Sequence, residues 1–322
     1  MKNAITDVAG IRVGHAGDAR AMTGLTVILC PSGTAGGVDV RGSATATRGL
    51  DALSPHHLVG EVNAILLTGG SAFGLDATAG VMRYLEERGV GFRAGPAVVP
   101  TVPACVIFDL SGPDPRARPT PTMAYQACEA ASEGPPAEGS AGAGMGATVG
   151  KLFGRERGMK GGVGTAGLAV PGGGTVGALA VVNTFGDVLD WRTGQLLAGL
   201  RDSPDGRELI STAAQLRAGR GRARFGEPAT TLGVVATDVG LGKGELHKLA
   251  QMATNGLTRS LSPAFSTFDG DVVFSLSCGE KKADLNILGL LAEEALAEAI
   301  KRAITQAKSL GGVPAWRDLR EG

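Results

Sequence analysis

The sequence predicts a mixed α/β protein, and three observations support this fold class. Apolar runs of strand length alternate with longer segments of helical periodicity along the first two-thirds of the chain. Glycine contributes 52 of the 322 residues, well above the usual ~7%, without a collagen repeat. No apolar run reaches the roughly 20 residues that span a bilayer. The length permits one large α/β domain or two ordinary ones, with many tight turns and close backbone contacts.

The expected elements follow from hydrophobic periodicity and from turn residues. Strands are predicted at residues 25–30, 62–68, 105–110 and 175–183, and helices at 73–88 and 123–131. Residues 132–150 are rich in small and turn-forming residues and are expected to form a long loop. Residues 187–191 should start the hairpin partner of strand 175–183.

The character of the chain changes near Thr193. From there to Ala229 the sequence is polar and irregular, which indicates an exposed connector with solvated charges at Arg217, Arg220, Arg222 and Arg224. Order resumes at Thr230. Strands are expected at 230–237 and 272–276, and amphipathic helices at 243–257 and 285–308.

The composition excludes several classes of function. The chain has 31 basic and 31 acidic residues, so no global field attracts nucleic acid or an anionic membrane, and the expected partner is a small peptide or amide. The four cysteines form no C-x-x-C pair, and the histidines are scattered, so we expect no metal site. The glycines at 69–74 lack the phosphate-loop order, and we expect no cofactor. Without a signal-peptide pattern at the N-terminus, the expected location is the cytoplasm.

Thr230 is the candidate nucleophile. It opens a strand directly after the loose connector, and its hydroxyl needs a nearby base to become reactive. Cleavage of the bond between Ala229 and Thr230 would place an α-amine, with a usual pKa of about 7.7 to 8.0, on the same residue. The side chain itself could make the cut by an N-to-O acyl shift. Taken alone, however, the local pattern favours a threonine that merely opens a strand.

A family resemblance extends over essentially the whole chain. The segment 229–238 (ATTLGVVATD) resembles the self-cleavage segment of the L-aminopeptidase/D-esterase (DmpA-like) family, which includes nylon-oligomer hydrolases of the NylC type. Similar motifs occur in the same order at 5–15, 67–75, 141–147 and 269–271. The resemblance implies an αββα sandwich, a single catalytic domain over 1–322 processed into chains 1–229 and 230–322, and a homo-oligomer, a tetramer of αβ units.

The resemblance also implies roles for four polar residues. Asn183 matches the asparagine that stabilises the oxyanion, and Lys151 matches a lysine that would lower the pKa of the new α-amine. Asp269 and Asp271 match the acids that position the nucleophile and its amine, and together with Thr230 they resemble the nylon-oligomer branch. The alternatives are a turn asparagine, a solvated lysine and a β-turn at residues 268–271. Thr267 shares the face of the two acids as a weaker candidate.

Two glycine-rich blocks are expected to line the pocket. Gly69, Gly70 and Ser71 would permit close packing beside the nucleophile, and Gly144 and Met145 belong to the second block. The glycines at 161, 162, 164 and 172–174 are expected to shape turns along the pocket wall.

One residue departs from the family pattern. Relatives resemble each other in having Asn or Gly before the nucleophile, whereas Ala229 tolerates a strained backbone less readily, so processing should be slower.

The expected substrates are short amides with a free amino group, including ω-amino-acid oligomers. Two rival functions remain: an acyltransferase resembling ornithine acetyltransferase that uses the same Thr, and a non-catalytic binding protein with an intact chain.

Overall fold

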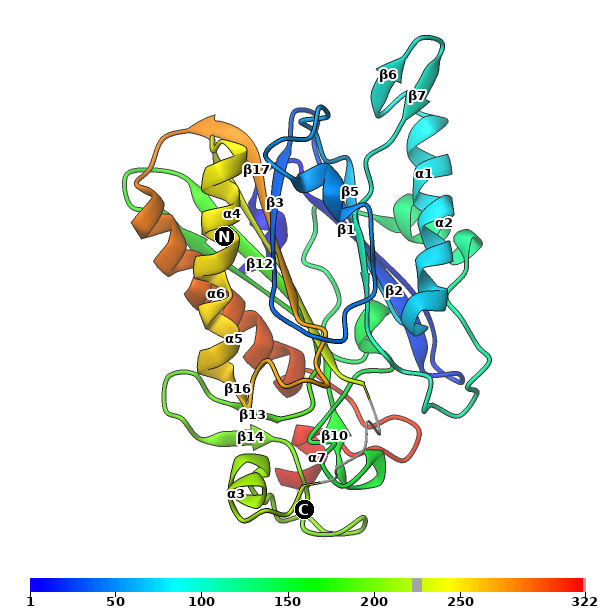
Figure 1. Ribbon diagram of the computed structural model, residues 1–322, viewed down its shortest axis with the longest axis vertical. Coiled ribbons are helices and arrows are strands. Elements are labelled where there is room, and N and C mark those ends of the chain that lie inside the picture. The colour runs from blue at the N-terminus through cyan, green and yellow to red at the C-terminus, as the bar shows by residue number, and fades with distance from the viewer. Residues whose placement is uncertain (222–227, 321–322) are drawn as a thin grey trace.

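A computed structural model describes residues 1–221 and 228–320 of the chain. Two five-stranded sheets lie face to face, and helices cover the outer face of each sheet (Figure 1). This arrangement confirms the α/β class and the αββα sandwich. No helix in the described part of the chain is long and apolar enough to cross a membrane.

The first sheet consists mainly of N-terminal strands. Its order is β1 (Arg12–Asp18), β2 (Thr23–Leu29), β5 (Ala64–Thr68), β8 (Ala104–Val106) and β4 (Thr47–Arg48). Helices α1 (Thr78–Glu86) and α2 (Pro121–Ala130) pack on its outer face (Figure 1). The predicted helix 73–88 begins instead as a 3-10 helix, η3 (Ser71–Ala77), because Gly70 and Ser71 both have left-handed backbone conformations.

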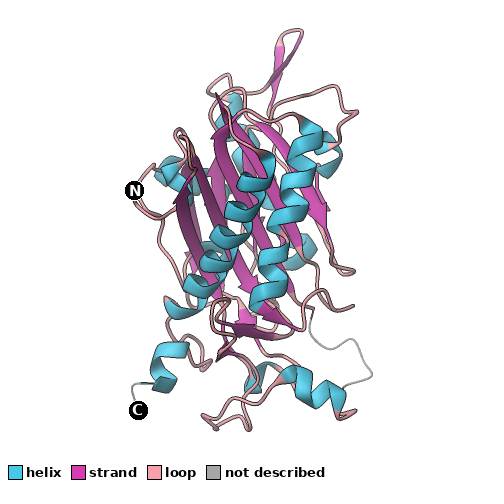
Figure 2. Cartoon of the chain, turned by 90° about the vertical axis from the view of Figure 1, so that its left-hand side faces the viewer, coloured by secondary structure: helices cyan, strands magenta, loops and turns pink. Residues whose placement is uncertain are grey.

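The second sheet pairs one strand from the N-terminal part of the chain with four strands from its C-terminal half. Its order is β11 (Gly162–Ala169), β12 (Thr175–Asn183), β15 (Thr230–Val239), β17 (Val272–Lys281) and β3 (Ala35–Val40). The long helix α6 (Leu285–Thr305) and helix α4 (Lys243–Ala253) cross its outer face (Figure 2), and α5 (Asn255–Ser260) follows α4. The predicted strand 175–183 is confirmed to the residue.

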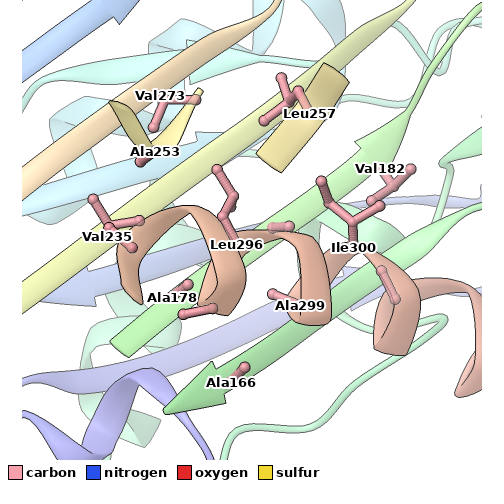
Figure 3. Close-up of a cluster of buried hydrophobic side chains, with 14 of the residues drawn as sticks. Ala166, Ala178, Val182, Val235, Ala253, Leu257, Val273, Leu296, Ala299 and Ile300 are labelled. Carbon is pink, nitrogen blue, oxygen red and sulfur yellow. The ribbon is translucent and has the colours of Figure 1, made fainter. Parts of the chain in front are cut away.

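Side-chain alternation along the strands builds both cores. In β12, Ala178, Ala180 and Val182 face the helices, whereas Leu179 and Val181 face the other sheet. On the helix side, Leu296, Ala299 and Ile300 of α6 pack on these strands (Figure 3). Strands buried on both faces therefore appear as continuous apolar runs in the sequence.

The structure corrects two of the sequence predictions for this sheet. Gly162 and Gly164 do not form turns but lie in β11, where a Cβ at Gly164 would come within 2.1 Å of the Ala299 carbonyl oxygen in α6. Residues 187–191 do not pair with β12, because β11 and β15 occupy both of its edges. The strand found there, β13 (Asp187–Leu189), instead joins β14 (Leu196–Ala198) and β16 (Leu261–Ser262).

The predicted connector is more ordered than its composition indicated. It contains β14 and helix α3 (Thr212–Arg217), and Arg201 is buried with its guanidinium bound to backbone carbonyls. Arg217 and Arg220 are exposed as expected, whereas Arg222 and Arg224 lie outside the described residues. The described residues also form the hairpin of β6 (Phe92–Ala94) and β7 (Ala97–Val99), the two-stranded sheet of β9 (Thr148–Val149) and β10 (Met159–Lys160), the short helix α7 (Trp316–Arg320) and several short 3-10 helices.

Candidate active site

The candidate nucleophile lies where two central strands of the second sheet meet. Thr230 is the first residue of β15, and its cross-strand partner is Asn183, the last residue of β12. Both residues are buried. The sheet therefore fixes the backbone of one candidate against that of the other, although 47 positions separate them in the sequence.

The hydroxyl of Thr230 is in contact with the peptide group that precedes it. Thr230 Oγ1 lies 2.5 Å from the carbonyl oxygen of Ala229 and donates to it. The same oxygen accepts a 2.8 Å hydrogen bond from the backbone N–H of Gly270. A nucleophilic oxygen therefore lies against a carbonyl group that a second donor already polarises, which is an arrangement suited to addition at that carbonyl carbon.

The hydrogen bonds of Asn183 define the orientation of its side-chain amide. Its Oδ1 accepts from Lys151 Nζ at 2.7 Å and from the backbone N–H of Thr148 at 3.0 Å. Its Nδ2 donates to the carbonyl oxygen of Phe108 at 3.1 Å. Because an amide nitrogen carries two hydrogens, this orientation leaves Asn183 a second N–H to offer to a ligand.

Lys151 binds Asn183, the cross-strand partner of Thr230 at the end of β12. Its Nζ donates to the carbonyl oxygen of Asn183 at 3.0 Å as well as to the side chain, and the lysine is buried. It is not the solvated loop lysine of the alternative interpretation. A buried cation here favours a neutral amine on a neighbouring group.

Two buried carboxyl groups lie on the other side of Thr230. Asp269 is fully paired, since Oδ1 accepts from Phe185 N–H and Oδ2 accepts from both the N–H and the hydroxyl of Ser266. Asp271 Oδ1 accepts from Thr231 N–H at 2.5 Å, and its Oδ2 is buried without a partner among the described residues. The turn lies two residues earlier than predicted, at residues 266–269 instead of 268–271, and Thr267 is exposed.

Burial raises the pKa of both carboxyl groups. The pKa of Asp271 rises to about 8, first because of burial and then because the charge of Asp269 is close. The pKa of Asp269 is also raised by burial, although its hydrogen bonds with Ser266 and Phe185 oppose the shift. The pair therefore has a high proton affinity for carboxyl groups, a property that is common at catalytic sites.

The two glycine-rich blocks surround Asp109, which the sequence analysis did not identify. Gly70 N–H donates to Asp109 Oδ1 at 2.7 Å, and a Cβ at Gly69 would lie 2.1 Å from Oδ2. Ser71 N–H donates to the Ile107 carbonyl oxygen. This block is therefore packed on the end of β8, directly beside the Phe108 carbonyl that holds Asn183.

Lys160 organises the second block. Its buried Nζ donates to the carbonyl oxygens of Gly144, Met145 and Ala147, at 3.3, 2.8 and 2.7 Å. Burial and the charge of Arg155 lower its pKa to about 7. Since the N–H of Thr148 donates to Asn183, Lys160 fixes the segment that leads to this bond. Local sequence carries no signal for this role, whereas an acid that ends an apolar strand was a visible signal for Asp109.

The backbone at the candidate cleavage site has no left-handed residue other than glycine. Among described residues other than glycine, positive φ angles occur at Asn3, Met22, Ser71 and Phe265, so Ala229 is not in the left-handed region. Alanine is therefore compatible with the conformation observed at this position.

The sequence of the chain matches a known protein family. The model of Peptidase family S58 matches residues 3–315 of the chain. The chain belongs to this peptidase family. Membership in S58 makes it a hydrolase of peptide or amide bonds.

Two curated relatives of this S58 protein have different names. An uncharacterized aminopeptidase of Mycobacterium leprae (strain TN) is 40% identical over an alignment that covers 99% of this chain and 95% of the relative. A 6-aminohexanoate-oligomer endohydrolase of Kocuria sp. (strain KY2) is 30% identical over 92% of this chain and 84% of the relative.

Solved structures support the fold of this S58 chain. The L-aminopeptidase D-Ala-esterase/amidase from Ochrobactrum anthropi, described as a variant of the Ntn hydrolase fold, matches with a TM-score of 0.73 and 21% identity over 97% of this chain and 88% of its own. A β-aminopeptidase of Burkholderia sp. matches with a TM-score of 0.70 and 24% identity over 100% and 93%. The architecture is therefore that of the Ntn hydrolases.

Proposed function

We propose that the chain cuts itself between Ala229 and Thr230 and that the freed Thr230 then hydrolyses amide bonds as an N-terminal nucleophile. The observation that carries this proposal is the 2.5 Å contact between Thr230 Oγ1 and the Ala229 carbonyl oxygen. A β-strand normally holds its side chains away from its own carbonyl groups, yet here a nucleophilic hydroxyl lies against the bond that must break.

The self-cleavage step balances without a cofactor. Thr230 Oγ1 adds to the carbonyl carbon of Ala229, the C–N bond breaks, and the hydroxyl proton ends on the nitrogen that becomes the α-amine. Water then hydrolyses the resulting ester, which returns a proton to Oγ1 and leaves a carboxylate on Ala229. Turnover repeats this chemistry with a substrate carbonyl in place of the Ala229 carbonyl.

In turnover, the surrounding side chains have complementary roles. The α-amine of Thr230 accepts the hydroxyl proton, and the buried charge of Lys151 keeps that amine neutral. Asn183 Nδ2 donates to the oxyanion that forms on the substrate carbonyl group. Asp269 and Asp271 orient the α-amine and the hydroxyl of Thr230. The hydrogen bonds of Lys151, Asn183, Asp269 and Asp271 support these proposed roles.

The proposed substrates are short amides with a free amino group: amino-acid amides, short peptides and ω-amino-acid oligomers. The names of the relatives, an aminopeptidase and a 6-aminohexanoate-oligomer endohydrolase, support this range. The combination of a Thr nucleophile with acids at 269 and 271 favours the nylon-oligomer branch, and therefore ω-amino-acid oligomers as substrates.

The test compares three variants with the wild-type protein by intact mass spectrometry and by hydrolysis of amino-acid p-nitroanilides and 6-aminohexanoate oligomers. Thr230→Ala should abolish both the fragments 1–229 and 230–322 and all turnover, whereas Thr230→Ser should retain both. Thr231→Val is the matched control, because Thr231 Oγ1 is buried without a partner among the described residues. Normal cleavage of Thr230→Ala would refute the proposal.

The same assay separates the rival functions. An acyltransferase would pass the acyl group from Thr230 to glutamate faster than to water, so added glutamate would divert the product. An intact mass for the wild-type protein with no hydrolysis of any amide would favour a binding protein.

We also propose that the processed protein assembles into a homo-oligomer of αβ units. The hairpin of β6 and β7 supports this, because it projects from the sandwich (Figure 1) with Phe92 and Val99 exposed. An isolated two-stranded hairpin is only marginally stable in water. Light scattering of the wild-type protein and of a Phe92→Ser variant tests the assembly, and a monomeric wild-type protein would refute it.

A further inference from the structure

The backbone N–H of Gly270 donates a hydrogen bond to the carbonyl oxygen of Ala229, the residue before the candidate nucleophile. We propose that this backbone N–H is an oxyanion donor, acting first on the Ala229 carbonyl during self-cleavage and then on the substrate carbonyl during turnover. We further propose that Ser266 is the positioning residue that holds it. This inference rests on the proposed function, because it assigns an additional group to the same nucleophile.

The local backbone aims Gly270 at the bond to be cut. Ala229 forms a parallel bridge with Asp269, in which Ala229 N–H donates to Phe268 O at 2.9 Å and Gly270 N–H donates to Ala229 O at 2.8 Å. These two bonds anchor the N–H and the C=O of Ala229 to the same neighbouring segment, residues 268–270. A donor at 2.8 Å from the oxygen that becomes negative is within the range of known oxyanion holes.

Only glycine fits at this position. A Cβ at residue 270 would lie 2.8 Å from Thr230 Oγ1 and 2.7 Å from the carbonyl oxygen of Ala44. Any side chain would therefore displace the nucleophile or the backbone behind it. The absence of a side chain lets the donor and the nucleophile approach the same carbonyl group.

The turn at residues 266–269 determines where this N–H points. Asp269 N–H donates to Ser266 O at 3.0 Å, and the hydroxyl and N–H of Ser266 both donate to Asp269 Oδ2, at 2.5 and 3.0 Å. Asp269 O in turn accepts from Ala44 N–H at 3.0 Å. Ser266 thus closes the turn directly before Gly270, and it touches neither Thr230 nor the scissile peptide in this network.

One donor site can act in both reactions because the same oxygen attacks in each. When Thr230 Oγ1 adds to a carbonyl carbon, the electron pair of the C=O bond moves to the oxygen, and that oxygen must lie near fixed donors. In the uncut chain this oxygen belongs to Ala229. After cleavage the Ala229 carboxylate leaves the position, and the substrate oxygen takes it, with Asn183 Nδ2 as the second donor.

The experiment uses Ser266→Ala and Ser266→Thr, the second of which keeps the hydroxyl. Self-cleavage is followed during cell-free synthesis of the full chain, and turnover is followed on the best p-nitroanilide from the substrate panel. We expect Ser266→Ala to slow both processing and kcat by about 10-fold or more, with KM nearly unchanged, because a loosened donor loses part of the roughly 10²–10³-fold effect of an oxyanion contact. Ser266→Thr should restore both rates.

Binding of an inhibitor distinguishes this role from a general structural one. A peptide aldehyde of the best acyl group adds to Thr230 and forms a tetrahedral oxyanion, whereas the matching primary alcohol does not. Ser266→Ala should weaken the aldehyde about 10-fold, again as part of the effect of an oxyanion contact, and leave the alcohol unchanged. Thr267→Ala is the matched control, since Thr267 is the exposed neighbour in the same turn. Equal weakening of both inhibitors, or wild-type rates in Ser266→Ala, would overturn the inference.

A crystal structure of the aldehyde adduct tests the donor itself. The adduct oxygen should lie about 2.7–3.1 Å from Gly270 N. An oxygen that points away from Gly270 would refute the assignment even though Thr230 carries the adduct. Failure of the proposed function is distinct, because Thr230→Ala would then still cleave and turn over.

Discussion

Asn183 and Thr230 face each other at the ends of β12 and β15, and Lys151 Nζ bonds both the backbone and the side-chain oxygen of Asn183. This relationship places a cation and an amide on one side of the nucleophile. The two acids and Gly270 lie on the other side. The site is thus assembled from the paired ends of strands, so its precision depends on the register of the second sheet.

Asn183→Asp should remove the donor and keep the shape of the side chain. A carboxylate still accepts from Lys151 and Thr148 but has no N–H for an oxyanion, so kcat on an amide substrate should fall about 10²–10³-fold. Steady-state kinetics and thermal unfolding of the processed protein check this. Asn183→Ala is the comparison variant. A wild-type kcat in the Asn183→Asp enzyme would exclude Asn183 as a donor.

Lys160→Met should change how stability depends on pH. Burial lowers the pKa of Lys160 to about 7, whereas the unfolded chain has a value near 10.4. Between these values the unfolded state binds more protons, so this group adds stability as pH rises, by up to about 1.4 kcal/mol per unit. Denaturant unfolding from about pH 7 to 10, the window between the two pKa values, should show this rise for the wild type relative to Lys160→Met.

Lys248→Met is the matched control for this measurement, because Lys248 is an exposed lysine on helix α4. Its curve should run parallel to that of the wild type. If the difference between the wild type and Lys160→Met stayed constant over the same pH range, the lowered pKa of Lys160 would be wrong.

The secondary structure was predictable where a sequence pattern is typical of only one kind of element. Strand 175–183 is an uninterrupted apolar run, and its bounds were found in full. Strand β11 was missed because glycine usually marks a turn, whereas here Gly162 and Gly164 make room for the backbone of α6. The predicted partner of β12 was wrong for a related reason: the glycine-rich strand β11, which precedes β12 in the sequence, and the distant strand β15 occupy its two edges.

The site was predictable only as far as the family motifs extend. Local pattern alone favoured a structural role for Thr230, and its nucleophilic role comes from the resemblance. Lys160 and Gly270 act through bonds to backbone groups that are distant in sequence, and Ser266 acts through bonds to Asp269 within a turn. Such bonds depend on the folded arrangement and leave no periodic or spacing signal.

Gly164→Ala should destabilise the protein through the contact between β11 and α6. An added Cβ would lie 2.1 Å from the Ala299 carbonyl oxygen, and both partners are backbone in regular elements. We expect a loss of about 1–3 kcal/mol in the free energy of unfolding. Gly244→Ala in α4 is the control, since a Cβ there meets nothing within 4 Å and should gain up to about 1 kcal/mol. Equal stability of the two variants in urea would contradict this packing.

The uncut chain should lose stability as pH rises because of Asp271. Its folded pKa is raised to about 8 by burial and by Asp269, whereas the unfolded value is about 3.9. Between these values the folded state binds more protons, so the contribution is present at low pH and is lost as pH rises toward the folded pKa of about 8.

Thr230→Ala keeps the chain uncut, and adding Asp271→Asn removes the titration while keeping an oxygen for Thr231 N–H. Urea unfolding from about pH 5 to 9 should therefore show the single variant losing stability relative to the double variant, by up to about 1.4 kcal/mol per unit. Thr230→Ala with Asp205→Asn, at an exposed acid, should follow the single variant. Parallel curves for all three proteins would mean that Asp271 is ionised throughout this pH range, which would contradict its raised pKa.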